Sequence, residues 1–99
     1  MQALIHALKS VAWPDHMARR KWRNDMVVFL ADARRRFQPG MARAIDVAAI
    51  HHDAVRVVLK LDMRRPPAPL PATTDLTVAE LMDHALDADA LIARLATPG

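Results

Sequence analysis

The chain has 99 residues, a net charge of +3, no cysteine and only two glycines. This length makes one domain, or part of one, with a modest core, and the absence of cysteine excludes disulfides and thiolate metal sites. Just over half of the residues are hydrophobic, alanine and leucine dominate, and tyrosine is absent, which favours an all-α protein over a β-sandwich.

Membrane and export signals are missing from the sequence. No apolar run approaches the roughly 20 residues that cross a bilayer. The first residues, MQALIHALKSVAWP, lack the basic start and the small-residue cleavage site of a signal peptide. Because the lack of cysteine also fits a reducing compartment, we expect a cytoplasmic protein that does not bind a membrane.

Charge divides the chain into two parts. Residues 1–65 carry 13 Lys/Arg and 6 Asp/Glu, a net charge of +7, whereas residues 66–99 carry one Arg and five Asp/Glu, a net charge of −4. We expect a basic helical body at 1–65, a proline-rich connector at 66–76 and an acidic C-terminal helix at 77–99 that packs on the body within one domain. Either the acidic end neutralises the basic body, or each part meets a different partner.

The first helix is predicted over residues 2–12, where apolar residues recur at helical spacing. A longer central helix is predicted from Trp13 to Phe37, about six turns. Pro14 suits its first helical position, and Gln38-Pro39-Gly40 ends it. The link between the two helices is short, so the first helix must fold back or bend sharply at Trp13-Pro14.

The central helix has two apolar sides. Its main stripe, which predicts a core position for Trp22 and Phe29, consists of Ala18, Trp22, Met26, Phe29, Leu30, Ala33 and Phe37. On the opposite side lie Val27, Val28 and Ala31. A helix that is apolar on two sides is either central in a bundle or docked against another chain.

The third segment begins at Gly40 and has a strongly helical composition at first. Residues 55–63 then alternate apolar and polar in the way of a strand. Because the chain offers no second strand for pairing, we favour a helix that continues to about Leu61 and keep a strand at 55–63 as the alternative.

The C-terminal part starts with four prolines in the ten residues of Arg65–Thr74, which predicts an extended connector. A last helix is predicted from Thr77 to about Ala96. Thr77 and Glu80 have the spacing of a capping box, and the apolar stripe consists of Leu81, Ala85, Ala88, Ile92 and Leu95. The predicted fold is therefore all-α, a small bundle of about four helices with a proline-rich connector before the last.

Three basic clusters point to a function. They are residues 19–23, 34–36 and 64–65. On the central helix, Arg20, Arg23 and Arg34 project to broadly one side, as a phosphate backbone would require. The candidate nucleic-acid-binding residues are Arg19, Arg20, Lys21, Arg23, Arg34, Arg35, Arg64 and Arg65. We expect a non-enzymatic binding protein whose basic face contacts an RNA or DNA backbone, in a nucleoprotein complex. Trp22 could stack on a base, but its place on the apolar stripe favours the core.

The alternative is a protein–protein interaction module or homo-oligomer, in which the arginines are a solvated helix face with stems that cover apolar surface. Metal sites and cofactors are not expected. The side chains of His51, His52 and Asp53 would point in different directions on a helix. Glu80, His84 and Asp87 are more typical of the solvent-exposed side of an amphipathic helix. No enzyme is expected, because nucleotide-binding motifs and a glycine elbow near the only serine, Ser10, are absent.

A family resemblance rests on two groups of residues. The first is His6-Ala7-Leu8-Lys9, then Pro14, then Trp22-Arg23, and the second is Pro71 with the segment from Leu76 to Asp83. Over residues 4–86 this pattern resembles a bacterial family catalogued as domain of unknown function 29. The chain departs from it in lacking acidic N-terminal helices, and Leu30 and His51 stand where an arginine and a tyrosine are usual. The resemblance implies an all-α fold and no particular activity, because the family has no established one.

Overall fold

The structure, a computed structural model, describes residues 1–96, and these contain helices and no strand. Four longer helices and two short ones follow in the order α1 (Gln2–Ala12), α2 (Arg19–Arg36), η1 (Pro39–Ala44, a 3₁₀ helix), α3 (Val47–Leu59), α4 (Val78–Met82) and α5 (Ala88–Ala96). The predicted all-α fold class is confirmed.

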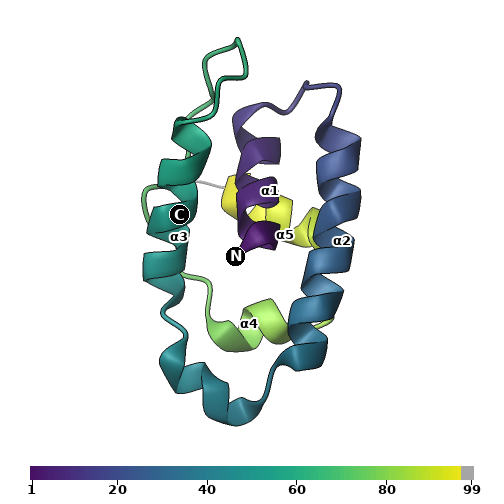
Figure 1. Cartoon of the computed structure of the whole chain (residues 1–99), viewed down its shortest axis with the longest axis vertical. Coiled ribbons are helices and arrows are strands. Elements are labelled where there is room, and N and C mark those ends of the chain that lie inside the picture. The colour runs from purple at the N-terminus through teal and green to yellow at the C-terminus, as the bar shows by residue number, and fades with distance from the viewer. Residues whose placement is uncertain (97–99) are drawn as a thin grey trace.

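Helix α1 is the centre of the arrangement. It runs between α2 and α3, and α5 packs against it as a third neighbour, while α4 contacts the far end of α2 (Figure 1). Ala3 and Ala7 are fully buried beside Leu4 and Leu8. Their small side chains let the neighbouring helices approach α1 closely, and the leucines fill the remaining space.

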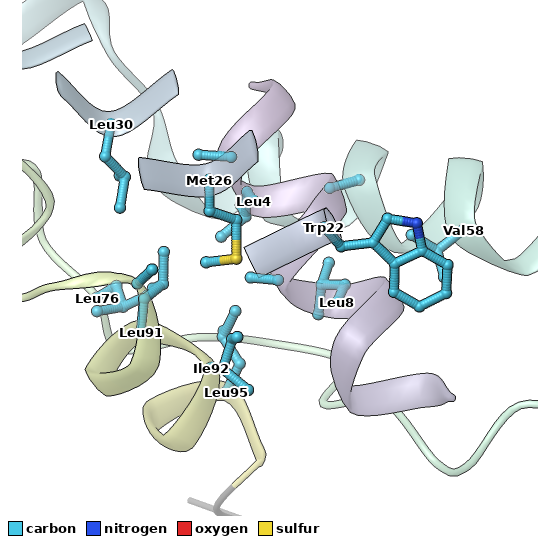
Figure 2. Packing of buried hydrophobic residues seen from close by; sticks show 14 of the residues in the cluster. Leu4, Leu8, Trp22, Met26, Leu30, Val58, Leu76, Leu91, Ile92 and Leu95 are labelled. Carbon is cyan, nitrogen blue, oxygen red and sulfur yellow. The ribbon is translucent and has the colours of Figure 1, made fainter. Parts of the chain in front are cut away.

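One hydrophobic core joins all of the longer helices. Leu4 and Leu8 of α1 meet Trp22, Met26 and Leu30 of α2 and Leu91, Ile92 and Leu95 of α5 (Figure 2). Trp22 is 5% exposed, as its place on the apolar stripe predicts, whereas Phe29 is only partly buried against the edge of the core.

The central helix is shorter than predicted, because residues 13–18 form turns and α2 starts at Arg19. The N–H of Trp13 donates to the carbonyl of Lys9 at 2.9 Å and closes α1, and the N–H of Arg19 donates to the carbonyl of His16 at 3.0 Å. Pro14 therefore stands in a turn, where its fixed φ is equally suited. The turns reverse the chain so that α2 can run antiparallel to α1 (Figure 1).

The third segment is helical to Leu59, so the alternative of a strand at 55–63 was wrong. The 3₁₀ helix η1 precedes α3, and the Asp46 side chain accepts a 3.1 Å hydrogen bond from the N–H of Ala49 at the start of α3. Tertiary packing decides the helix here, because Ala54 and Val58, at helical spacing, are both buried.

The prediction of a single last helix was also wrong, because the helix is interrupted between α4 and α5. Asp83 Oδ1 accepts from the N–H of Ala85 at 2.9 Å, and Asp87 Oδ1 accepts from the N–H of Ala90 at 2.8 Å. Such local bonds compete with a continuous helix. Ala85, predicted on the buried stripe, is consequently exposed. The capping box is confirmed, since Thr77 Oγ1 accepts from the N–H of Glu80 and Glu80 Oε1 accepts from the N–H of Thr77.

The proline-rich connector forms neither helix nor strand, and it is fixed to the helices at three points. The indole N–H of Trp13 donates to the carbonyl of Arg65 at 3.0 Å, and the backbone N–H of Ala68 donates to the carbonyl of Ala12 at 2.8 Å. The fully buried His51 donates its Nε2–H to the carbonyl of Pro71 at 2.7 Å. The connector thus ties the end of α1 to α3.

Candidate nucleic-acid interface

The eight predicted contact residues lie at two separate ends of the molecule. Arg34 and Arg35 stand in the last turn of α2, about 22 Å along the helix axis from Arg19. Two of the three clusters share the other end, which we call the basic end and which consists of Arg19, Arg20, Lys21, Arg23, Arg64 and Arg65.

Trp13 brings the two clusters of the basic end together. Its hydrogen bond to the Arg65 carbonyl holds the start of the connector against the turns that precede α2. A hollow of about 280 Å³ lies between these segments and is lined by Trp13, His16 and Arg65, among others. His16 also lines a second hollow, of about 390 Å³, together with Arg19, Arg20 and Arg23. His16 therefore joins the two hollows, and it places Arg65 on the same end of the molecule as the first turns of α2.

Four arginines of the basic end are exposed. The side chains of Arg19, Arg20, Arg64 and Arg65 make no hydrogen bond or ion pair with any other of residues 1–96. Arg64 adopts φ of 59°, the left-handed region, with its N–H donating to Asp62 Oδ1 at 3.2 Å. A non-glycine residue in this conformation carries strain, and Arg64 lies at the bend between α3 and the connector.

Lys21 and Arg23 are already paired. Lys21 Nζ donates to Asp25 Oδ2 at 2.9 Å, and this hydrogen bond holds the pKa of Asp25 below its usual range. Arg23 makes a two-pronged contact with Asp89 of α5, from Nε to Oδ1 at 3.1 Å and from Nη2 to Oδ2 at 3.0 Å. The hydrogen bonds lower the pKa of Asp89 and raise that of Arg23, and the positive charges of Arg23 and Arg19 lower the pKa of Asp89 further.

Trp22 lies beneath the basic end but offers no ring face to a base. The His16 ring stacks on it with centroids 4.9 Å apart and planes inclined by 25°. Lys9 Nζ lies 4.5 Å from the Trp22 ring centroid, in cation–π contact. Burial, followed by the charge of Lys21, lowers the pKa of Lys9. The core assignment of Trp22 is confirmed, and neither His16 nor Lys9 was predicted from the sequence as its neighbour.

At the far end of α2, Arg34 is used within the fold. Its Nε–H donates to the carbonyl of Leu81 at 3.0 Å, and Nη2 donates to the carbonyl of Leu86 at 2.6 Å. Next to it, Arg35 and Arg36 both pair with Asp32, at 2.8 and 3.3 Å. The predicted ridge of Arg20, Arg23 and Arg34 is not a free solvent-facing row, since Arg34 fixes the break between α4 and α5 and Arg23 holds Asp89.

The histidine and carboxylate groups weighed from the sequence are not brought together. His51 is buried against Pro71, while His52 and Asp53 are exposed. Glu80, His84 and Asp87 lose their common helix face because α4 ends at Met82. Within residues 1–96, no three side chains of the types His, Cys, Asp and Glu are grouped so that they could hold a metal ion.

The second apolar side of α2 is exposed. Val27 and Val28 retain 47% and 65% of their surface in contact with solvent. With Ala31, Asp32 and Arg35 they line a hollow of about 410 Å³. A helix that is apolar on two sides is either central in a bundle or docked against another chain. Because this side of α2 is exposed, it does not face the centre of the bundle, and it is a surface available to another chain.

Comparison with known proteins supports the fold. No family model matches the sequence, and no curated protein matches it. An α-helical protein of unknown function from Rhodospirillum rubrum has a similar solved structure, with a TM-score of 0.83 and 25% identity over 97% of this chain. The present chain spans 63% of the length of that protein. The resemblance to domain of unknown function 29 stays a prediction.

Among the described residues, no helix combines the length and the hydrophobicity that crossing a membrane requires.

Proposed function

We propose that the protein is a non-enzymatic binding protein whose basic end contacts the phosphate backbone of a nucleic acid, as an accessory or small subunit of a nucleoprotein complex. One observation carries the proposal. Arg19 and Arg20 share one end of the molecule with Arg64 and Arg65. All four residues are exposed, and their side chains make no hydrogen bond or ion pair with any other of residues 1–96.

Arginine suits this role because its planar guanidinium matches two phosphate oxygens at once. Each neutralised phosphate releases condensed counterions, so several arginines on one surface give affinity that falls steeply with salt. The burial of Trp22 removes the aromatic side chain that the sequence offered for base stacking. Contact with the backbone and little dependence on base sequence is therefore the expected mode.

The test is affinity for a labelled 20-base-pair duplex, as DNA and as RNA, measured by fluorescence anisotropy over a range of salt concentrations. Wild type should bind with a steep salt dependence. Replacing Arg19, Arg20 and Arg65 together with Ala should reduce the slope of log K against log salt by about three units, because each phosphate contact contributes about 0.9.

A single change, Arg20→Ala, should reduce the slope by about 0.9, and Arg43→Ala is its matched control. Arg43 is exposed and lies in η1, at the opposite end of the molecule (Figure 1). Its loss removes the same charge but should leave the slope nearly unchanged. A flat salt dependence in wild type would exclude backbone binding, because such binding requires counterion release.

A second candidate function is supported by the exposed apolar side of α2. Val27, Val28 and Ala31 could dock against another protein or a second copy of the chain, with Asp32 and Arg35 as polar rim. Light scattering after size exclusion separates the two functions. A concentration-dependent oligomer that Val28→Asp disrupts, without nucleic-acid affinity, would favour the protein–protein function.

A further inference from the structure

The hollow between the first turns of α2 and the start of α5 encloses one carboxylate among several cations. Its volume is about 390 Å³, and Arg19, Arg20, Arg23 and Asp89 all line it. Asp89 is held by both prongs of the Arg23 guanidinium, and the charge of Arg19 also acts on it. Arg20 lines the same hollow, and its side chain makes no hydrogen bond or ion pair within residues 1–96.

The geometry of this pair is the geometry by which arginine binds phosphate. Two parallel N–H···O bonds, at 3.1 and 3.0 Å, reach two oxygens of one planar carboxylate. A phosphate presents two oxygens to a guanidinium in the same way, with more negative charge. The three arginines of the hollow would neutralise a phosphate better than Asp89 neutralises them.

The pair can open at small cost. The Arg23 side chain is 43% exposed and the Asp89 side chain 66%. Exposed ion pairs of this kind contribute little to folding, because water and salt screen both charges. Exchange of Asp89 for a stronger anion on Arg23 therefore requires only a side-chain rotation.

We propose that this hollow is a binding site for one phosphate group and that Asp89 occupies the place of the phosphate in the free protein. The inference rests on the proposed function, which supplies the phosphate from a nucleic-acid backbone. When the phosphate enters, Arg23 exchanges the carboxylate for it, and Arg19 and Arg20 contribute charge from the sides of the hollow. Asp89, which belongs to the acidic part of the chain, is then an intramolecular competitor. It weakens the binding of phosphate to the basic part.

Asp89 has another use that the test must separate from this one. It stands in the first turn of α5, where a negative charge is favourable to the helix dipole. If Asp89 served only the helix dipole, its replacement would change the stability of the protein and would not change the affinity for phosphate.

The experiment compares Asp89→Asn with Asp15→Asn. Asn keeps the shape of the side chain and removes one negative charge in each case. Asp15 is exposed, lies in the turns beside the basic end, and makes no hydrogen bond or ion pair with the rest of residues 1–96. It therefore reports the effect of net charge at this end without the contact to Arg23.

Two probes are used with the full chain. Anisotropy of a labelled 20-base-pair DNA duplex reads nucleic-acid binding, and the side-chain Nε–Hε NMR signal of Arg23 reads the hollow during titration with inorganic phosphate. Asp89→Asn should bind the duplex about fivefold more tightly than wild type, the change that a surface ion pair commonly gives. It should also shift the Arg23 signal at correspondingly lower phosphate concentrations. Asp15→Asn should change either value by less than about twofold.

Each of the following outcomes contradicts either the phosphate site, the nucleic-acid function, or both. If wild type binds the duplex with a steep salt dependence but Asp89→Asn behaves as Asp15→Asn does with both probes, the phosphate site in the hollow is wrong and the proposed function stands. If the Arg23 signal responds to phosphate, more readily in Asp89→Asn, while no variant binds the duplex, the nucleic-acid function is wrong and the phosphate site stands. If neither probe binds, both are wrong.

Discussion

The guanidinium of Arg34 donates a 2.6 Å hydrogen bond to the carbonyl oxygen of Leu86, 52 positions later in the chain. Together with the 3.0 Å bond to the carbonyl of Leu81, it spans the break between α4 and α5. Backbone carbonyls at the end of a short helix need such donors when they are shielded from water. One arginine of α2 therefore holds the C-terminal segment in its bent course.

Replacing Arg34 with Ala should lower the free energy of unfolding by about 2–3 kcal/mol, because two hydrogen bonds from a charged group are lost. Its neighbour Arg35 is the control. The Arg35 side chain is 75% exposed and pairs only with Asp32, so Arg35→Ala should cost less than about 0.5 kcal/mol. Urea unfolding followed by circular dichroism measures both. Equal losses in the two variants would mean that Arg34 is as solvated as Arg35.

Trp22→Ala should lower the free energy of unfolding by about 3–5 kcal/mol, as large aromatic truncations in cores do. The side chain is 5% exposed and lies beneath both His16 and Lys9. Val28→Ala on the exposed side of the same helix should change stability by less than about 0.5 kcal/mol. The thermal midpoint of each variant is the measurement. An unchanged midpoint in Trp22→Ala, with loss of binding, would assign Trp22 to ligand contact instead of the core.

Thr77→Ala should destabilise the protein by roughly 1 kcal/mol through loss of the cap on α4. Helix α4 is only five residues long, but its loss should affect the whole fold, since Leu81 is buried and its carbonyl binds Arg34. Thr73→Ala, an exposed change in the connector, is the comparison and should have almost no effect. If chemical denaturation gives the same midpoint for both variants, the cap is not coupled to the core.

Asp89 should titrate below the usual aspartate value of about 3.9, because Arg23 hydrogen-bonds its charged form. A folded-state pKa below the unfolded value means that the pair stabilises the protein above about pH 4. This contribution is lost as the pH falls through the lowered pKa of Asp89. Carboxyl-carbon NMR should show the Asp89 titration move to higher pH in Arg23→Ala. The titration of Glu80, whose pKa is lowered by the hydrogen bond from Arg94, should stay in place and serves as the internal control.

Features set by neighbouring residues could be predicted from the sequence. The spacing of Leu4 and Leu8 in α1, the burial of Trp22 and the Thr77–Glu80 cap each depend on periods or offsets of a few residues. The absence of a helix in the connector followed from its prolines for the same reason. These predictions locate the helices and the core, and they are the part of the fold that the sequence shows directly.

The breaks in the helices could not be predicted, because distant contacts decide them. The turns at 13–18 are stabilised by the bond from Trp13 to Arg65, and the bend between α4 and α5 by the bonds from Arg34. Helical propensity and an apolar stripe continue through both breaks, so local rules extend the helices too far. The same limit applies to the candidate site, since the sequence alone does not tell a free arginine such as Arg20 from one held by the fold, such as Arg34.

The central place of α1 has a consequence for the order of synthesis. Leu4 and Leu8 emerge from the ribosome long before Leu91 and Leu95, which cover one side of them (Figure 2). Until α5 has emerged, the apolar surface of α1 that α5 covers stays exposed on the nascent chain, and such exposed surface favours aggregation. This core is thus completed only after α5 has been translated.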